Sequence, residues 1–196
     1  MKLIILNRRR IGVTAIIIGL MLILFGVERN FDERLKGALM HSTINGFKSY
    51  SGLNKTFNYM LPQDWDSSEE NNLGGEIIYN NQFTSKDQSI HGFVQVWNFK
   101  GDLKKFLENS KESAFNPKGI TYKIYSMSPI NINKLNGYLL NFTQDIGSGN
   151  YYKGFEYFLS NDDKFFRFSF FVRESKFKET MPIVFENIVE TMRYSK

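Results

Sequence analysis

The sequence predicts an α+β protein in which an N-terminal transmembrane helix precedes a mostly antiparallel β-sheet packed with helices, arranged like an α/β/α sandwich. Residues 11–27 contain no charged residue, which is typical of a membrane span. Beyond residue 56, short segments alternate between apolar and polar side chains and are separated by turn residues, as antiparallel strands are. Two further segments, near residues 103–115 and 179–193, repeat apolar residues at helical spacing.

Residues 11–27 are interpreted as a single-pass anchor in the cell membrane. At 1.5 Å per residue this segment covers roughly 26 Å, near the lower limit for a hydrocarbon core of about 30 Å. A buried core helix would normally show one polar face, and this segment shows none. A cleaved signal peptide is the sharper alternative, but the chain continues Phe25-Gly26-Val27-Glu28, without the small residues that cleavage needs. An uncleaved anchor is therefore preferred.

The basic residues beside the span predict its orientation. Arg8, Arg9 and Arg10 directly precede the span, and Lys2 and the α-amino group add positive charge to the same side. The basic residues that follow the span are interleaved with acidic ones. Because positive flanks remain in the cytoplasm, we expect a cytoplasmic N-terminus and a C-terminal domain outside the cell.

Four regions follow from this interpretation. Residues 1–10 form the basic cytoplasmic N-terminus, and residues 11–27 the anchor. Residues 28–55 are predicted to be a juxtamembrane helix and a linker, because the end of this region is rich in Gly, Ser and Asn. Residues 56–196 are predicted to fold as one extracytoplasmic α+β domain.

The composition excludes several classes of protein. The net charge of +5 suggests a nucleic-acid-binding protein, but four basic and no acidic residues lie in the first 27 positions, so the remainder carries only +1. A nucleic-acid-binding domain would need a basic footprint of its own. The chain has no cysteine, which excludes a fold held by disulfides. Its hydrophobic content of 42% is ample for a core.

In the first half of the domain, alternation predicts strands at Phe57–Leu61, Glu76–Phe83 and Ile90–Phe99. Between the first two strands, Gln63–Gly75 is predicted to be an acidic, polar loop. Asp102 is suited to cap a helix that runs to about Phe115.

The second half is predicted to be a β-meander followed by a helix. Asn136-Gly137 is the strongest hairpin signal in the chain. In the last strand Phe166, Phe168 and Phe170 point to one side, as core residues do. The predicted strands are Tyr122–Met127, Ile130–Leu135 as either a separate strand or an extension of the first, a strand beginning at Tyr138, Tyr151–Leu159 and Phe165–Val172, and the closing helix is Glu179–Arg193.

Two motifs at the ends of the domain suggest a family. The opening Phe57-x-Tyr59-x-x-Pro62-x-x-Trp65 and the closing Phe185-x-x-Ile188-x-x-Thr191-Met192, together with the order of elements, resemble the PsbP-like α/β/α sandwich family. The resemblance covers about residues 56–194. It implies a non-catalytic accessory or binding protein at a membrane. No functional residue of the photosynthetic members has a counterpart here.

Metal and cofactor sites are not expected. Two histidines, His41 and His91, and no cysteine make a structural zinc site implausible. An acidic stretch resembles the start of a calcium loop, but Glu69 stands where that loop needs glycine, so a solvated loop is preferred. The alternating residues of this stretch are Asp64, Asp66, Ser68 and Glu70.

No catalytic motif is evident in the sequence. Gly147-Ser148-Gly149 lacks the Lys-Ser/Thr pair of a phosphate-binding loop and is better explained as a hairpin turn. No G-x-S-x-G elbow occurs. We therefore expect no enzymatic activity and no cofactor.

The aromatic residues outside the expected core suggest a surface for a partner or ligand. These residues are Trp65, Tyr151, Tyr152, Phe165 and Phe171. The favoured hypothesis is a membrane-anchored extracytoplasmic binding or accessory domain without catalysis, with the lipid bilayer and an envelope protein as partners and no nucleic acid. The alternative is an anchored domain that binds a small ligand, a lipid or a cell-wall fragment. An envelope hydrolase is the least favoured function.

Overall fold

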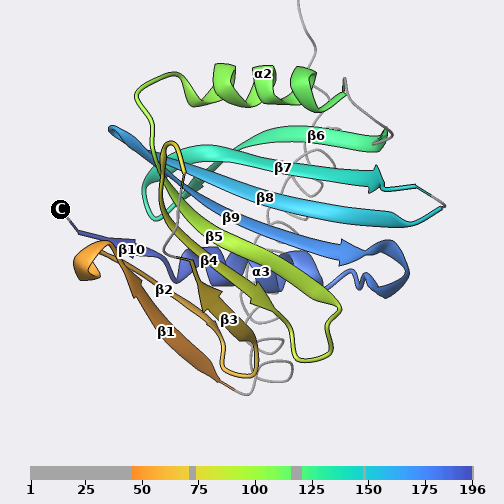
Figure 1. Ribbon diagram of the computed structural model, residues 1–196, viewed down its shortest axis with the longest axis horizontal. Coiled ribbons are helices and arrows are strands. Elements are labelled where there is room, and N and C mark those ends of the chain that lie inside the picture. The colour runs from red at the N-terminus through yellow and green to blue at the C-terminus, as the bar shows by residue number, and fades with distance from the viewer. Residues whose placement is uncertain (1–45, 71–73, 116–120, 148, 196) are drawn as a thin grey trace, which may run out of the picture. The chain divides into compact units, whose positions relative to one another are not determined.

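The computed structural model describes residues 46–70, 74–115, 121–147 and 149–195, which form antiparallel strands and two α-helices (Figure 1). The elements are β1 (Phe47–Gly52), β2 (Phe57–Pro62), β3 (Asp66–Glu69), β4 (Ile77–Thr84), β5 (Ile90–Asn98), α2 (Leu103–Phe115), β6 (Thr121–Ile132), β7 (Leu135–Asp145), β8 (Tyr151–Asn161), β9 (Lys164–Arg173), α3 (Met181–Glu190) and β10 (Arg193–Tyr194). A large sheet has the strand order β3-β4-β5-β9-β8-β7-β6, and a small sheet the order β1-β2-β10.

The prediction of an α+β fold with a mostly antiparallel sheet and helices packed on it is confirmed. The predicted span at residues 11–27, the basic segment with Arg8, Arg9 and Arg10, and the predicted helix at residues 28–45 lie outside the described residues. Within the described part of the chain, neither helix has the length and apolar character needed to cross a membrane.

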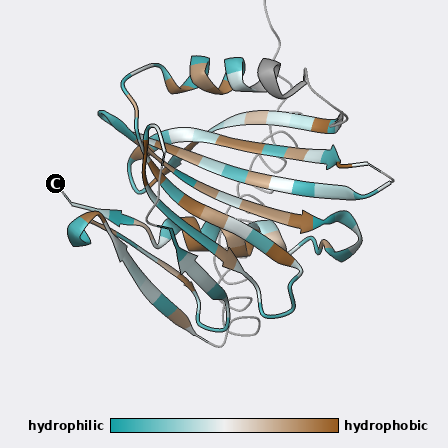
Figure 2. Ribbon diagram, in the orientation of Figure 1, coloured by the Kyte–Doolittle hydropathy of each residue, from teal (hydrophilic) through white to brown (hydrophobic). Residues whose placement is uncertain are grey.

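One face of the large sheet is sealed by α3 and β2. Along β9 the alternate residues Phe166, Phe168 and Phe170 are fully buried on this face, as predicted. The Phe185 ring of α3 stacks on Phe170 with centroids 4.3 Å apart, and the Phe57 ring of β2 stacks on Phe166 at 5.1 Å. Figure 1 shows α3 behind the central strands, and Figure 2 shows hydrophobic residues alternating with hydrophilic ones along them.

The opposite face of the large sheet carries α2. The predicted cap is confirmed, because the Lys105 backbone N–H donates to Asp102 Oδ1 at 3.1 Å. Beneath the helix lies a cluster of buried residues comprising Leu103, Leu107, Leu140, Phe142, Phe158 and Phe165. In Figure 1 α2 lies beyond β6, away from β3 and β4, so it covers this face only in part.

The predicted linker before residue 56 is wrong in its last part. β1 pairs with β2 from Phe47 opposite Pro62 to Gly52 opposite Phe57. Between these strands Leu53, Asn54 and Lys55 all have positive φ and reverse the chain. The Gly, Ser and Asn content that suggests a linker is equally suited to a tight reversal beside an exposed edge strand.

The predicted polar loop at Gln63–Gly75 contains a strand. β3 pairs with β4 from Asp66 opposite Thr84 to Glu69 opposite Asn81, and all four residues of β3 are exposed. β3 lies at the edge of the large sheet, where polar side chains discourage pairing with other chains. A strand without an apolar side shows no hydrophobic alternation, which is why the sequence did not predict it.

The predicted turn at Asn136-Gly137 is also misplaced. β6 is one continuous strand, and the chain reverses at Asn133 and Lys134, which have φ of 53° and 67°. Gly137 lies inside β7, where a Cβ atom would come within 1.8 Å of the Phe158 carbonyl oxygen. Glycine is therefore needed there for close approach between strands rather than for a turn.

The closing helix is shorter than predicted. α3 begins at Met181 and ends at Glu190, and Arg193–Tyr194 forms β10, which pairs with β2. The small sheet therefore joins the first described strand to the end of the chain.

Candidate functional site

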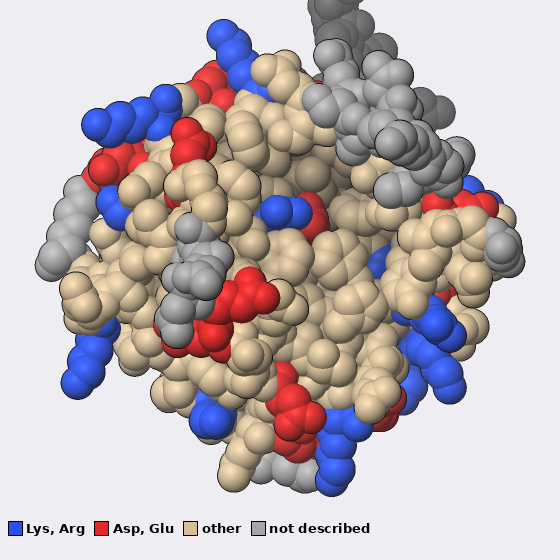
Figure 3. Space-filling view, in the orientation of Figure 1, with Lys and Arg blue, Asp and Glu red and all other residues tan. Residues whose placement is uncertain are grey.

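The α2 face, defined as the face of the large sheet opposite α3, carries the candidate site. Strand β9 directs Phe165, Arg167, Ser169 and Phe171 to this face, because successive side chains alternate across a sheet. Figure 3 looks onto this face and shows a largely uncharged surface that is hollowed near its centre.

Two hollows lie on the α2 face. The smaller one, of about 410 Å³, is beneath α2 and includes Trp97, Phe106 and Tyr125 in its lining. The larger one, of about 720 Å³, extends toward β3 and β4. Phe171 and Gln144 line both hollows, so the two form one continuous surface.

An aromatic platform occupies the middle of the larger hollow and consists of His91, Phe93, Tyr152 and Phe171. The His91 and Phe171 rings are stacked, with centroids 5.8 Å apart and an angle of 26°. Phe93 lies 6.0 Å from Phe171, and Tyr152 lies edge-on to His91 at 5.5 Å. These residues come from neighbouring strands β5, β9 and β8, which hold the rings side by side on the sheet.

Polar residues border the platform on the side of β3 and β4. Asp66 lies opposite Thr84, and Thr84 lies opposite His91. Ser68 lies opposite Gln82 in the next row of the same face. This border therefore offers hydroxyl, amide and carboxylate groups.

The border on the side of β7 is formed by Gln144, which lies opposite Tyr152, and by Ile146, which is 52% exposed. Within the described part of the chain, several border side chains have no hydrogen-bond partner and are free to bind a ligand. They are Asp66, Ser68, Thr84 and Gln144.

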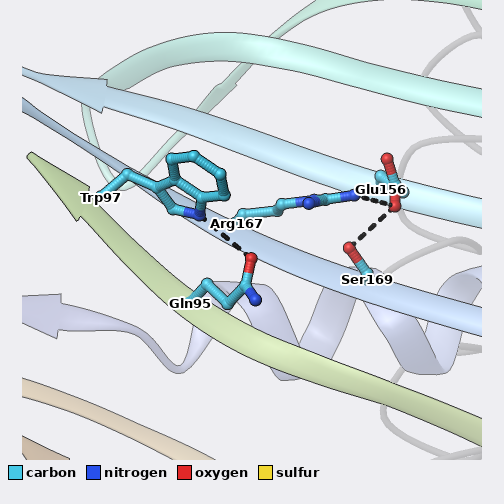
Figure 4. Close-up of polar contacts among 5 residues, drawn as sticks. All are labelled: Gln95, Trp97, Glu156, Arg167 and Ser169. Atoms are coloured by element: carbon cyan, nitrogen blue, oxygen red, sulfur yellow. Dashed lines mark hydrogen bonds and ion pairs between the residues drawn. The ribbon is translucent and has the colours of Figure 1, made fainter. Parts of the chain in front are cut away.

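An ion pair lies on the floor of the smaller hollow (Figure 4). Arg167 Nη2 donates to Glu156 Oε1 at 2.6 Å, and Ser169 Oγ donates to the same oxygen at 3.0 Å. The guanidinium carbon of Arg167 lies 4.7 Å from the centre of the Phe93 ring and 5.2 Å from that of Phe158. Charge pairing and ring contacts thus hold the Arg167 side chain in place on the sheet.

Neighbouring polar groups are neutral at physiological pH. Burial, with a contribution from the Glu156 charge, raises the pKa of Tyr125 to about 12. The same two causes raise the pKa of Tyr122. Trp97 Nε1 donates to Gln95 Oε1 at 3.0 Å, so the indole N–H is satisfied within the sheet.

Burial lowers the pKa of His91 below its ordinary value, and the charge of Arg173 lowers it further. At neutral pH the imidazole is therefore uncharged and acts as one more ring of the aromatic platform.

The residues predicted from the sequence as a ligand surface divide into two groups. Tyr152 and Phe171 line the larger hollow, and Phe165 lines the smaller one with only 1% of its surface exposed. Trp65 and Tyr151 line neither hollow. The Trp65 ring stacks on Phe83 with centroids 5.2 Å apart, and Lys123 Nζ lies 3.8 Å from the centre of the Tyr151 ring.

The sequence did not predict Glu156, Arg167, His91 or Phe93 as site residues. One signal was available for Arg167, which lies directly between the aromatic residues Phe166 and Phe168 in β9. A charged residue between buried aromatic neighbours requires a partner, and Glu156 is that partner.

The acidic stretch that resembles a calcium loop is part of the sheet edge. Both Glu70 carboxylate oxygens accept amide hydrogen bonds, from Asn80 at 2.6 Å and from Gln82 at 2.5 Å. Among the described residues, no group of three or more His, Cys, Asp or Glu side chains is placed to hold a metal ion.

No protein-family model matches the sequence, and no curated protein matches it. Solved structures with a similar fold include cyanobacterial PsbP (CyanoP) from Synechocystis sp. PCC 6803, with a TM-score of 0.55 and 11% identity over 79% of this chain and 95% of that chain. A protein from Bacteroides thetaiotaomicron VPI-5482 has a TM-score of 0.51 and 16% identity over 76% of this chain and 48% of that chain. The resemblance to PsbP in fold is thereby confirmed.

Proposed function

We propose that this protein is a non-catalytic binding protein that is held at the outer surface of the cell membrane and takes a ligand on the α2 face. The observation that carries the proposal is the continuous pair of hollows, in which half-buried aromatic rings lie beside polar side chains that have no partner in the described part of the chain. Concave surfaces of this composition are typical of ligand sites. Residues 11–27 supply the anchor in this proposal.

The chemistry of the site supports binding rather than catalysis. The charge of Glu156 is balanced by Arg167, and its Oε1 also accepts a hydrogen bond from Ser169, so it is poorly suited to act as a general base. His91 contacts aromatic rings, and none of its contacts within the described residues joins it to a carboxylate or a hydroxyl group. The PsbP-like fold agrees with this proposal, because the resemblance implies an accessory or binding role.

The proposal is tested by closing the larger hollow. The full-length protein in lipid nanodiscs is screened by thermal shift against a library of neutral small molecules. Thr84→Trp fills the hollow from its border, whereas Ser128→Trp adds the same bulk at an exposed position of β6, away from both linings. We expect compounds that stabilise the wild-type protein and the Ser128→Trp variant but not the Thr84→Trp variant. Compounds that stabilise all three proteins equally, or no compound at all, would contradict the proposal.

An envelope protein is the second candidate for the bound partner. Ile146 is 52% exposed on the rim of the larger hollow, where an apolar side chain would be covered by a partner. A photo-crosslinker at Ile146 should then capture one membrane protein in intact cells, and the same crosslinker at Ser128 should not. Equal capture from both positions would exclude this candidate.

A further inference from the structure

The aromatic platform of the larger hollow offers rings from one side only. His91, Phe93 and Phe171 project from the same face of the sheet. A flat ligand would therefore stack with one of its faces and keep the other toward solvent. The negative face of an aromatic ring attracts polarised C–H groups, and the rings of sugars present such groups on one face.

The borders of the hollow supply what the edge of a sugar ring requires. Thr84 and Ser68 have hydroxyl groups, Gln144 has an amide, and each of these can both donate and accept hydrogen bonds. Sugar hydroxyl groups also do both. An acyl chain would leave these side chains unpaired, which opposes a lipid as the ligand.

The charges around the hollow favour an uncharged ligand. Among the described residues, its lining contains one carboxylate, Asp66, and no lysine or arginine. The nearby Arg167 is paired with Glu156, and Arg173 Nε donates to the Tyr152 hydroxyl at 3.0 Å. A phosphate or carboxylate ligand would therefore meet no free cation in the lining. A cationic ligand would be repelled by the nearby Arg173. Asp66 would attract it only weakly, because this carboxylate is exposed and its charge is screened by solvent.

The size of the hollow favours a ligand with more than one ring. A volume of about 720 Å³ lies within the range of pockets for drug-sized ligands. Because Phe171 and Gln144 also line the smaller hollow, a ligand that stacks on the platform can extend toward α2.

We propose that the larger hollow binds a neutral oligosaccharide, and this inference rests on the proposed binding function of the α2 face. One sugar ring packs against the aromatic platform at Phe171. Its hydroxyl groups bond to Thr84 and Asp66 on one side and to Gln144 on the other.

The inference is tested with the full-length protein in lipid nanodiscs, applied to an array of neutral oligosaccharides. Positive sugars are titrated by calorimetry, with adenosine, choline and decanoate as probes of other classes. We expect at least one oligosaccharide to bind and to bind more tightly than its monosaccharide unit. Phe171→Leu, which keeps apolar volume but removes the ring, and Gln144→Ala should each weaken binding at least tenfold.

Phe177→Ala serves as the matched control. The Phe177 ring is half-buried and stacks on Phe155, outside both hollows, so its removal should leave sugar binding unchanged. Sugar binding that neither Phe171→Leu nor Gln144→Ala weakens would overturn the assigned site. If adenosine, choline or decanoate binds through Phe171 and no sugar does, the saccharide class is wrong and the proposed binding function stands. If no probe binds, the saccharide inference fails, and the Thr84→Trp screen separately decides the binding function.

Discussion

At the scale of single residues, the ion pair on the floor of the smaller hollow should contribute to the free energy of unfolding, because it is partly buried. The side chains of Glu156 and Arg167 are 8% and 24% exposed. Breaking a fully buried pair costs about 3–5 kcal/mol, and the partial exposure of Arg167 reduces this, so Glu156→Gln should lower the free energy of unfolding by about 1–3 kcal/mol. Urea denaturation measures the loss.

Lys104 and Glu108 provide the matched control on the surface of α2. Their charged atoms are 3.7 Å apart, and the side chains are 56% and 51% exposed. Glu108→Gln should therefore cost less than about 0.5 kcal/mol. Equal losses for the two substitutions would show that the Glu156–Arg167 pair is no more than a surface contact.

His91 predicts a dependence of stability on pH. Its pKa is lowered in the folded state by burial and by Arg173, so between the folded pKa and the unfolded value near 6.5 the unfolded chain binds more protons. The free energy of unfolding should therefore fall as pH falls through about 6.5 and become level below the folded pKa of His91. An NMR titration of the imidazole measures this pKa directly. Arg173→Gln should raise it, and an unchanged value would contradict the assigned cause.

Gly137 tests the close approach of β7 and β8. The Cβ atom of Gly137→Ala would lie 1.8 Å from the Phe158 carbonyl oxygen, so the strands must separate. We expect a loss of about 2–4 kcal/mol in the free energy of unfolding. Gly74→Ala is the control, because its Cβ atom meets nothing within 4 Å. Similar losses for both variants would remove the steric explanation.

At the scale of elements, the β6–β7 hairpin is tied to the end of α3. Asn133 Nδ2 donates to the Glu190 and Met192 carbonyl oxygens, at 3.0 Å and 2.9 Å. Asn133→Gly removes both bonds but tolerates the positive φ, and we expect a loss of about 1–2 kcal/mol. Asn133→Ala should cost about 1 kcal/mol more, because alanine must adopt the left-handed conformation. Denaturation of the two variants measures the difference, and identical losses would show that the turn is not strained.

Elements with an apolar side could be predicted from the sequence, and elements without one could not. The alternation of β9 and the helical pattern of α3 reflect burial on a known face, so both were found. β3 is fully exposed and is held mainly by backbone pairing with β4, and in β1 the partly buried Phe47 and Tyr50 lie three residues apart, so neither strand shows a hydrophobic alternation. The β6–β7 turn was misplaced because Gly137 is needed for the close approach of β7 and β8 rather than for a turn. Only the position of β8 in the structure shows this.

The candidate site shows the same division. The sequence indicated that Phe171 and Tyr152 lie outside the expected core, but it did not predict that they lie near each other. Pairing across the hairpin of β8 and β9 places Glu156 opposite Ser169 and diagonal to Arg167. The predicted strands Tyr151–Leu159 and Phe165–Val172 are separated by only a few residues, which implies a hairpin of this register, so the ion pair could have been predicted from the sequence. The border residues Asp66 and Ser68 could not be predicted in this way, because the sequence did not predict strand β3.

At the scale of the whole molecule, the predicted anchor determines where the ligand site is exposed. Deletion of residues 1–27 should release the protein from the membrane fraction into solution, because the span supplies the membrane affinity. In intact cells, added protease should digest the C-terminal domain of the full-length protein. A cytoplasmic control protein should stay intact, and a C-terminal domain that is digested only after lysis would reverse the predicted orientation.

The small sheet has a mechanical consequence. A pulling force that reaches the described domain from its N-terminal side enters at Phe47, which lies opposite Pro62 at the open end of the β1–β2 hairpin. Force applied at this end breaks the backbone hydrogen bonds between β1 and β2 one after another rather than all at once. β2 then resists through Phe57, Tyr59 and Leu61, all at least 99% buried. We therefore expect β1 to separate from β2 before a pulling force disturbs the large sheet and its hollows.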